Sequence, residues 1–445
     1  MQRLLYNIMY RSFPPILFVA GLLACSVLNL AGAAISGESE TWHKMTFTFD
    51  GPESSEKAFL NPFTDYRLEA IFRKQGSSRS YRVPGYFAAD GKSAESGAVS
   101  GSKWRVHFAP DEPGQWSYRV SFRSGSGIAI SETRGESAGF MDGETGHFEV
   151  GLSDKQAPDL RAKGRLEVVG EHYLRFAGSG EYFLKFGADA PENLLAYDDI
   201  DATPNVKGWR KSWAPHMKDY PGDGIDLLWG TNRDKGKALF GGIHYLSTKG
   251  MNVFSFLTFN VDGDDHNVYP YLLKAKEADY VAYAADNKGK DAQGWDRFFH
   301  HDRFDCSKMD QWERIFEYGD RKGMYLHFKT SEAENCFKMD GGDLGPERKL
   351  YYRELIARYG HHLALNWNIG EESTQSTEQI VDIAAYIRSL DPYKHQVVLH
   401  THGKDSDHEK HYTPLLGDAS ELTGLSMQTN QSDFSRVHGA VAKWV

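Results

Sequence analysis

Two adjacent carboxylates, Glu371 and Glu372, follow a short apolar run that begins at Asn366. The segments on either side, 347–359 and 380–390, place apolar residues at helical spacing. A short buried strand between two helices is typical of a parallel sheet, in which functional residues collect at the carboxyl ends of the strands. The pattern therefore predicts a functional edge at these glutamates. Taken alone, the pair fits the start of a helix equally well, because the helix dipole favours acidic residues there.

Polar side chains also follow the other predicted strands of this sheet. Apolar runs predict six parallel strands, at 182–187, 252–260, 324–330, 364–369, 396–400 and 422–429. Helical periodicity is found between them at 236–249, 308–322, 346–358 and 377–389. This alternation favours a (β/α)8 TIM barrel over an open doubly wound sheet, because no glycine-rich phosphate-binding turn follows the first strand.

The residues at the carboxyl ends of these strands suit a polyhydroxylated ligand such as a sugar. They include Glu192, Asp264, Glu332 and His402. Trp367 is predicted to floor a cleft, since a sugar needs an aromatic face on which to stack. The other predicted substrate-binding residues are Asp189, Asn260, His327, Lys329, Asn368, His400 and Gln428. Lys329 is expected either to meet a carboxylate or sulfate on the sugar or to pair with Glu332 or Glu334.

The barrel is expected to occupy residues 160–445, and only its strands one to six lie in this range. A closed eight-stranded barrel needs two further strand–helix units after the helical pattern at 434–444. The chain is therefore expected to be C-terminally truncated, with unpaired edges at its first and sixth strands.

Residues 40–151 have the pattern of a separate β domain. Apolar and polar residues alternate at 46–49, 66–72, 104–108 and 116–122. A loop-rich stretch, 123–146, leads to a last strand at 147–150. Short alternating strands at this spacing predict an immunoglobulin-like β-sandwich. Its aromatic residues are expected to fill the core, with a sugar-binding face as the alternative.

Residues 1–34 have the pattern of a signal peptide. Two arginines precede an apolar stretch at 16–30, and small residues follow it at 31–34. A lipoprotein processing site at Cys25 is the alternative. The protein is therefore expected to be secreted or periplasmic. The other two cysteines, Cys306 and Cys336, are expected either to form a disulfide or to remain as buried thiols.

Composition limits the partners of the chain. The net charge of −10 argues against nucleic acid or an anionic membrane as partner, and no segment after the signal peptide has the length and apolarity of a membrane span. No cofactor is predicted. The acidic loop 262–265 lacks the spacing of a helix–loop–helix calcium site and is read as a solvated turn. His400 and His402 share a strand face but lack a third zinc ligand, so no metal is predicted.

Glycoside hydrolysis needs a carboxylic acid that protonates the leaving oxygen and a second carboxylate across the cleaved bond. Glu371 and Glu372 are predicted to contribute catalytic chemistry. They cannot form the whole pair, because adjacent side chains at a strand end diverge. The second carboxylate must therefore come from another strand.

The run WNIGEE at 367–372 is similar to the signature that ends strand four in a large clan of retaining glycoside hydrolases with barrel folds. The resemblance implies that Glu372 is the general acid/base and that the nucleophile comes from a seventh strand, so that this chain is expected to be inactive alone. The sequence departs from the signature at Glu371, where the clan has an asparagine that binds the sugar's 2-hydroxyl.

A wider resemblance covers residues 42–445. The run WRVHFAPDEPGQW at 104–116 looks like an N-terminal immunoglobulin-like domain of unknown function in secreted bacterial proteins, where it precedes a glycoside-hydrolase-like barrel. The stretches 304–308, 326–329 and 353–358 also look like that family. The resemblance implies a secreted glycoside hydrolase of the retaining type that acts on a complex polysaccharide. The alternative is a noncatalytic carbohydrate-binding or adhesion protein.

Overall fold

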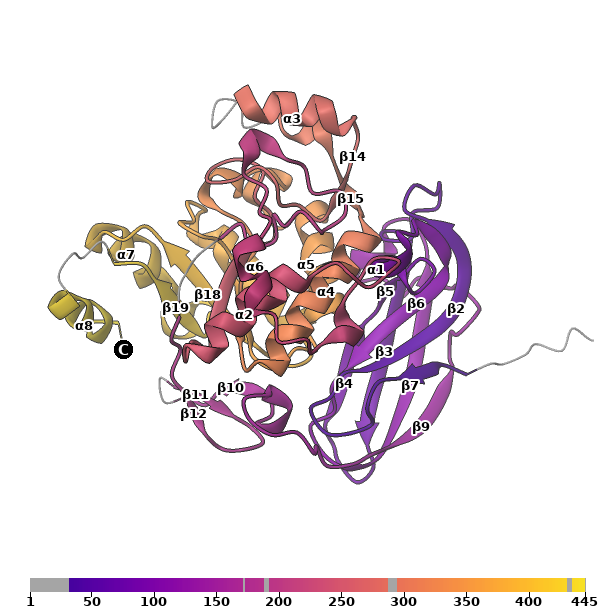
Figure 1. The fold of residues 1–445 in the computed structure, drawn as a ribbon. Coiled ribbons are helices and arrows are strands. Elements are labelled where there is room, and N and C mark those ends of the chain that lie inside the picture. Colours follow the sequence, from indigo (N-terminus) through magenta and orange to yellow (C-terminus); the bar gives the residue numbers. More distant parts are fainter. Residues whose placement is uncertain (1–31, 171–172, 188–191, 287–293, 430–433, 445) are drawn as a thin grey trace, which may run out of the picture. The chain divides into compact units, whose positions relative to one another are not determined.

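A computed structural model describes residues 32–170, 173–187, 192–286, 294–429 and 434–444 (Figure 1). The part of the signal-peptide pattern before residue 32, including Cys25, lies outside the described residues. Residues 32–445 form one compact unit. No helix in the described part of the chain is both long enough and apolar enough to span a membrane.

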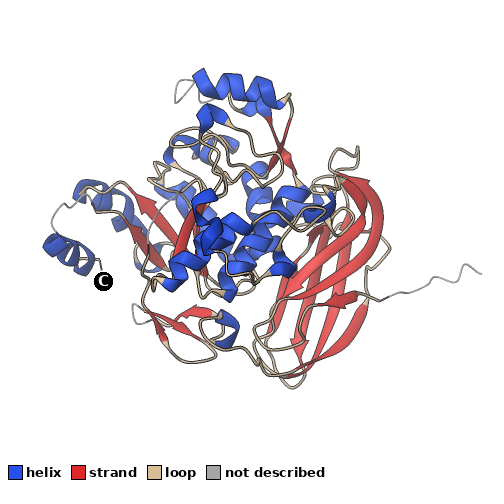
Figure 2. Ribbon diagram, in the orientation of Figure 1, coloured by secondary structure: helices blue, strands red, loops and turns tan. Residues whose placement is uncertain are grey.

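The N-terminal part consists of two antiparallel sheets, which Figure 2 draws as the long red strands. The first sheet has the order β1-β2-β6-β5, and the second has the order β4-β3-β7-β8 with β9 paired to β7. Their bounds are β1 Ala34–Ser36, β2 Met45–Ser55, β3 Tyr66–Lys74, β4 Ser80–Pro84, β5 Tyr86–Phe87, β6 Ser100–Phe108, β7 Gly114–Ser124, β8 Glu136–Ser137 and β9 Thr145–Val150. A short helix, α1 (Ser93–Ser96), precedes β6.

Aromatic side chains fill the space between these two sheets. Phe72 and Phe108 stack with ring centroids 4.1 Å apart, and Phe47 contacts both Phe72 and Tyr118. All four of these residues are buried. The expectation that the aromatic residues form a core is confirmed for them, whereas the immunoglobulin-like topology stays a prediction.

A five-stranded parallel sheet with the order β13-β16-β17-β18-β19 follows. Its strands are β13 Val253–Leu257, β16 Tyr325–Lys329, β17 Leu365–Asn368, β18 Gln396–Thr401 and β19 Gly424–Met427. The associated helices are α2 Lys237–Thr248, α4 Cys306–Arg321, α5 Pro346–Tyr359, α6 Thr377–Leu390, α7 Asp405–Tyr412 and α8 Phe434–Ala442. Every residue of β13, β16 and β17 is buried, which explains their continuous apolar runs. Five of the six predicted parallel strands are confirmed, and the closed barrel stays a prediction.

The predicted first strand, 182–187, is wrong as a strand of this sheet. Its first two residues form β12 (Tyr182–Phe183), which pairs antiparallel with β11 (Leu174–Phe176) beside β10 (Leu166–Val168). Beyond this hairpin, Asn252 donates its backbone N–H to Phe186, and Leu257 of β13 donates its own to Glu192. Local hairpin pairing therefore takes the place of the predicted parallel strand.

An insertion after β13 was not predicted from the sequence. It contains the antiparallel ribbon of β14 (Tyr271–Leu273) and β15 (Phe299–Phe304), with α3 (Glu277–Asp286) between them (Figure 1). Tyr271, Phe299 and Phe304 are fully buried, so the ribbon belongs to the aromatic core.

The antiparallel sheets contact the helices through buried polar side chains. Arg353 and Arg358 on α5 donate to the carbonyl oxygens of Leu68 and Phe87, each at 3.0 Å. Cys306 at the start of α4 donates its backbone N–H to the Glu56 carboxylate at 2.7 Å. Cys306 and Cys336 are both free buried thiols, which settles the question left open by the sequence.

Candidate active site

A cavity of about 360 Å³ lies at the carboxyl ends of the parallel strands. It is lined by Glu192, Asp264, Glu332, Glu371, Glu372, His400, Ser426, Met427 and Gln428. The lining contains no Phe, Tyr or Trp, and five of its residues carry carboxylates. The cavity therefore offers hydrogen bonds and negative charge to a ligand.

Backbone hydrogen bonds fix the turn that carries the two adjacent glutamates. Glu371 donates its N–H to Ser331 at 2.8 Å, and Ser373 donates its own to His400 at 2.9 Å. Helix α6 begins only at Thr377, where Ser376 provides a capping box. The interpretation of Glu371 and Glu372 as a helix start is therefore wrong, because the turn joins β17 to the neighbouring strand ends before the helix begins.

Glu371 is one of three ionisable groups that meet at the cavity. The ammonium group of Lys329 lies 2.9 Å from Oε1 of Glu192 and 2.8 Å from Oε1 of Glu371. Burial and a hydrogen bond with Glu192 raise the pKa of Glu371 to about 9, although Lys329 opposes this shift. If one proton is shared between the two carboxyl groups, the remaining negative charge is balanced by the Lys329 ammonium and the three groups carry no net charge. At neutral pH we therefore expect Glu371 to be protonated and Glu192 to be ionised.

Glu332 is a second buried carboxylic acid in the same cavity. The backbones of Glu332 and Glu371 form an isolated parallel β-bridge. The carboxylate of Glu332 accepts the backbone N–H of Asp264 at 3.2 Å. Burial, followed by repulsion from Glu334 and Asp264, raises the pKa of Glu332 to about 9. Gly263 permits this approach, because a Cβ at its position (φ +101°) would lie 2.7 Å from both Glu332 carboxylate oxygens.

The two raised pKa values predict that the stability of the protein depends on pH. A carboxyl group whose pKa rises on folding stabilises the fold fully below its unfolded value, near 4.5, and this stabilisation is lost as the pH rises towards 9. Glu332→Gln should therefore reduce the loss of unfolding free energy between pH 5 and 9, by up to about 1.4 kcal/mol per pH unit. Urea unfolding at several pH values measures this slope. An unchanged slope in Glu332→Gln would contradict the assignment.

Glu372 has an unusual backbone conformation at the cavity wall. Its φ of +46° lies in the left-handed region, which a residue with a long side chain rarely occupies. Its Oε2 lies 3.1 Å from Nδ1 of His402, and its side chain is 36% exposed. Strain of this kind is retained mainly at functional sites, where the surrounding structure holds it in place.

His400 and Gln428 form the wall that β18 and β19 contribute. Nε2 of His400 lies 3.0 Å from Oε1 of Gln428, and Nδ1 of His400 lies 3.6 Å from Oε1 of Glu371. The structure thus brings Glu371, Glu372, His400 and Gln428 together around one cavity, as the sequence predicts.

Two predicted roles are corrected by burial. Trp367 is completely buried and donates its ring N–H to Asp391 at 3.1 Å, so it belongs to the helix-facing side of β17 and offers no face to a sugar. Lys329 is also completely buried, and its ammonium is held between Glu192 and Glu371. Lys329 therefore orients these carboxylates and does not bind a sugar directly. The predicted pairing of Lys329 with Glu332 or Glu334 is wrong, because its observed partners are Glu192 and Glu371.

Three other predicted binding residues, Asn260, His327 and Asn368, are buried and do not line this cavity. His327 lies 2.9 Å from the Lys185 ammonium and 3.3 Å from the Asn368 amide. Asn260 is buried beside Asn335. Asp189 lies outside the described residues.

The acidic loop 262–265 is not the solvated turn that the sequence predicted. Asp262 is buried with its carboxylate 3.3 Å from the Lys338 ammonium. Asp265 is also buried, and this burial raises its pKa to about 6. Only Asp264 is exposed, and it reaches the cavity.

The sequence places Glu192 and Glu332 among the strand-end residues but assigns them no catalytic or binding role. Both follow predicted strand ends, which is the only signal that they carry. Their contacts to Lys329 and to the Asp264 backbone join segments that are far apart in the chain.

Residues 38–123 match the model of a domain of unknown function, DUF5060. No curated protein matches the chain. The chain is similar to the crystal structure of a provisionally assigned glycoside hydrolase from Bacteroides vulgatus ATCC 8482, with a TM-score of 0.54 and 16% identity over 83% of this chain. It spans 57% of the length of that protein.

Two further structures have weaker similarity. A family 5 glycoside hydrolase from the same organism gives a TM-score of 0.32 at 16% identity, over 54% of this chain and 40% of that one. The endo-1,4-β-mannanase of Rhizomucor miehei gives 0.32 at 12% identity, over 58% of this chain and 65% of that one. Both TM-scores are below 0.5, so neither similarity shows a shared fold. What the comparisons establish is a DUF5060 segment in a chain that shares its fold with a provisionally assigned glycoside hydrolase.

Proposed function

We propose that the chain belongs to a secreted glycoside hydrolase of the retaining type that acts on a complex polysaccharide. The observation that carries this proposal is the position of Glu372, which is held with a positive φ at a cavity of carboxylates at the ends of the parallel strands. Glu372 is the general acid/base in this proposal. The nucleophile is assigned, by the resemblance to the barrel clan, to a carboxylate on a seventh strand of the barrel.

Glu371 acts in this proposal as a positioning residue. A protonated carboxyl group has one donor and one acceptor, and an amide side chain offers both of these as well. A Glu371 held neutral by burial and by Glu192 can therefore make the hydrogen bonds expected of the clan's asparagine. This chemistry accounts for the departure of the sequence from the signature at this position.

The sugar is held in this proposal by hydrogen bonds from the cavity wall. His400 and Gln428 lie at one side, and Glu332 and Asp264 lie at the other. A protonated Glu332 can donate to a sugar hydroxyl, whereas the exposed Asp264 can accept from one. Asn260, Asn368 and His327 are buried, so their proposed role is to support the residues that line the cavity, whereas Asp189 remains a proposed contact for a further sugar unit.

The proposal is tested by incubating the full-length gene product with a panel of neutral, acidic and sulfated polysaccharides and measuring new reducing ends. Release of reducing ends by the wild-type protein, lost in Glu372→Gln, is the expected result. Binding of a polysaccharide without any release would reject the enzyme.

One observation favours a second candidate, a noncatalytic carbohydrate-binding or adhesion protein. The carboxylate of Glu372 is paired with His402 at 3.1 Å, and a group that must give up a proton to a leaving oxygen has to leave this partner first. Release of reducing ends, measured beside isothermal titration with the same polysaccharides, distinguishes the two. The binding candidate predicts that the wild type and Glu372→Gln both bind but that neither gives products, whereas the enzyme predicts products from the wild type alone.

A further inference from the structure

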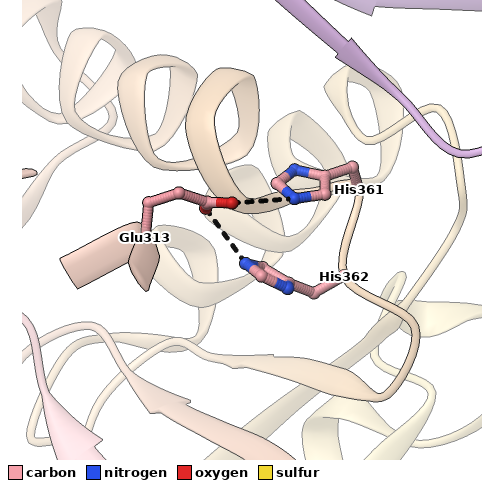
Figure 3. Close-up of side chains that lie close together, drawn as sticks. All are labelled: Glu313, His361 and His362. Carbon is pink, nitrogen blue, oxygen red and sulfur yellow. Dashed lines mark hydrogen bonds and ion pairs between the residues drawn. The ribbon is translucent and has the colours of Figure 1, made fainter. Parts of the chain in front are cut away.

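A cluster of two histidines and a glutamate lies at the other end of the parallel sheet. Glu313 is on α4, and His361 and His362 occupy the turn between α5 and β17 (Figure 3). This turn precedes β17, whereas Glu371 and Glu372 follow it. The cluster is therefore separate from the candidate active site.

The three side chains converge on one point. Nε2 of His361 lies 3.1 Å from Oε1 of Glu313, and Nε2 of His362 lies 3.1 Å from Oε2 of the same carboxylate. The ligand atoms of all three residues lie within 4.8 Å of one another. Nitrogen and oxygen ligands about 2.0 Å from a tetrahedral Zn²⁺ are roughly 3.3 Å apart. The two nitrogen–oxygen distances of 3.1 Å are close to this value, although each ends on a different oxygen of the carboxylate.

His361 provides a second and independent observation. His361 is only 4% exposed, yet neither of its ring nitrogens makes a hydrogen bond of acceptable geometry. Nε2 is close to the Glu313 oxygen without being aligned with it. A buried imidazole without an aligned hydrogen-bond partner is costly, and a metal ion bound at its Nε2 would remove this cost.

The surroundings of His362 resemble those of a metal-binding histidine. Its other nitrogen, Nδ1, lies 2.7 Å from Oδ2 of Asp320. A carboxylate on the far nitrogen of a ligating histidine fixes the orientation of the ring and its protonated nitrogen. An adjoining cavity of about 470 Å³, lined by Glu313, His361 and Asp320 among others, leaves room for a water molecule as fourth ligand.

The same groups can also form an ion-pair network without a metal. Lys44 donates to Glu313 at 2.9 Å and to Glu317. Burial lowers the pKa of His362, but Asp320 and Glu313 outweigh this effect and raise it to about 10. A proton on His362 thus competes with a metal ion for the same nitrogen. The three carboxylates of Glu313, Glu317 and Asp320 are enough to balance Lys44 together with a divalent ion.

We propose that Glu313, His361 and His362 form a binding site for a divalent transition-metal ion of the Zn²⁺ class. Two imidazoles and one carboxylate suit zinc better than calcium or magnesium, which prefer oxygen ligands. The ion ties α4 to the turn that leads into β17, and it stabilises the fold away from the carboxylate cavity.

The test is metal binding to the full chain after treatment with a chelator and dialysis. We expect calorimetric titration with ZnCl₂ to give one equivalent per chain and MgCl₂ to give no binding. Co²⁺ should give the visible absorption of a tetrahedral site. His361→Gln and Glu313→Gln should each weaken Zn²⁺ binding by at least about tenfold.

Two control variants make the result specific. His266→Gln removes another completely buried histidine, and it should leave Zn²⁺ affinity unchanged. His43→Gln disrupts the more exposed cluster of His43, Glu38 and Glu40, and it should also leave the affinity unchanged. Loss of binding in His43→Gln alone would overturn the assignment, as would a wild-type protein that binds neither Zn²⁺ nor Co²⁺. The Co²⁺ spectrum uses only the wild-type protein, so it decides the matter even if His361→Gln does not fold.

Discussion

Glu372→Gln should lower kcat/KM for polysaccharide hydrolysis by about 10² to 10⁴-fold, the usual contribution of a general acid/base. Glutamine keeps the size of the side chain and removes only its capacity to exchange a proton. The affinity for polysaccharide should therefore stay within about threefold of the wild-type value, as measured by titration.

Glu371→Gln is the matched variant for this prediction. Because Glu371 is expected to be neutral at pH 7, glutamine reproduces its donor and acceptor and should retain most of the activity. The two adjacent substitutions should thus differ by more than about tenfold in kcat/KM. If Glu371→Gln is the inactive variant and Glu372→Gln keeps its activity, the acid is Glu371 and the role proposed for Glu372 is wrong.

Lys329→Met should destabilise the protein by about 3 kcal/mol at pH 7, because it removes the ammonium that lies between Glu192 and Glu371. Methionine fills nearly the same volume, so lost packing contributes little. Urea unfolding measures the change. A loss below about 0.5 kcal/mol would show that the ammonium does not balance a buried charge.

Double variants identify which carboxylate carries that charge. Adding Glu192→Gln to Lys329→Met should recover at least about 1 kcal/mol, because the uncompensated negative charge is then gone. Adding Glu371→Gln should recover almost nothing, because Glu371 is already neutral. If Glu371→Gln instead recovers more unfolding free energy than Glu192→Gln, the proton is on Glu192.

The parallel strands could be predicted from the sequence because they are buried on both faces. Apolar runs located β16, β17 and β18 to within about two residues of their observed bounds. The same property explains the error at Trp367. A strand with two buried faces gives no alternation, so the sequence does not show which side chains face the cavity and which face the helices.

The sequence predicts which polar residues lie at the strand ends, but it does not predict which of them contact one another. The sequence places Glu192, Lys329 and Glu371 at three strand ends, and only the folded chain shows that one ammonium lies between the two carboxylates. The positive φ of Glu372 has no signal in the sequence either, because that conformation is favoured by glycine and asparagine. The insertion with β14 and β15 was missed because β14 is only three residues long and β15 contains four polar residues in succession.

The contacts of Arg358 have a consequence for how the protein unfolds. Its buried guanidinium on α5 bonds to Glu354 on the same helix and to the carbonyl oxygen of Phe87 in the antiparallel sheet. Separation of the sheet from the helix would leave this charged group without its carbonyl acceptor. The segment 151–160 therefore does not act as a hinge between two independent modules, and the sheets and helices should melt in a single cooperative transition.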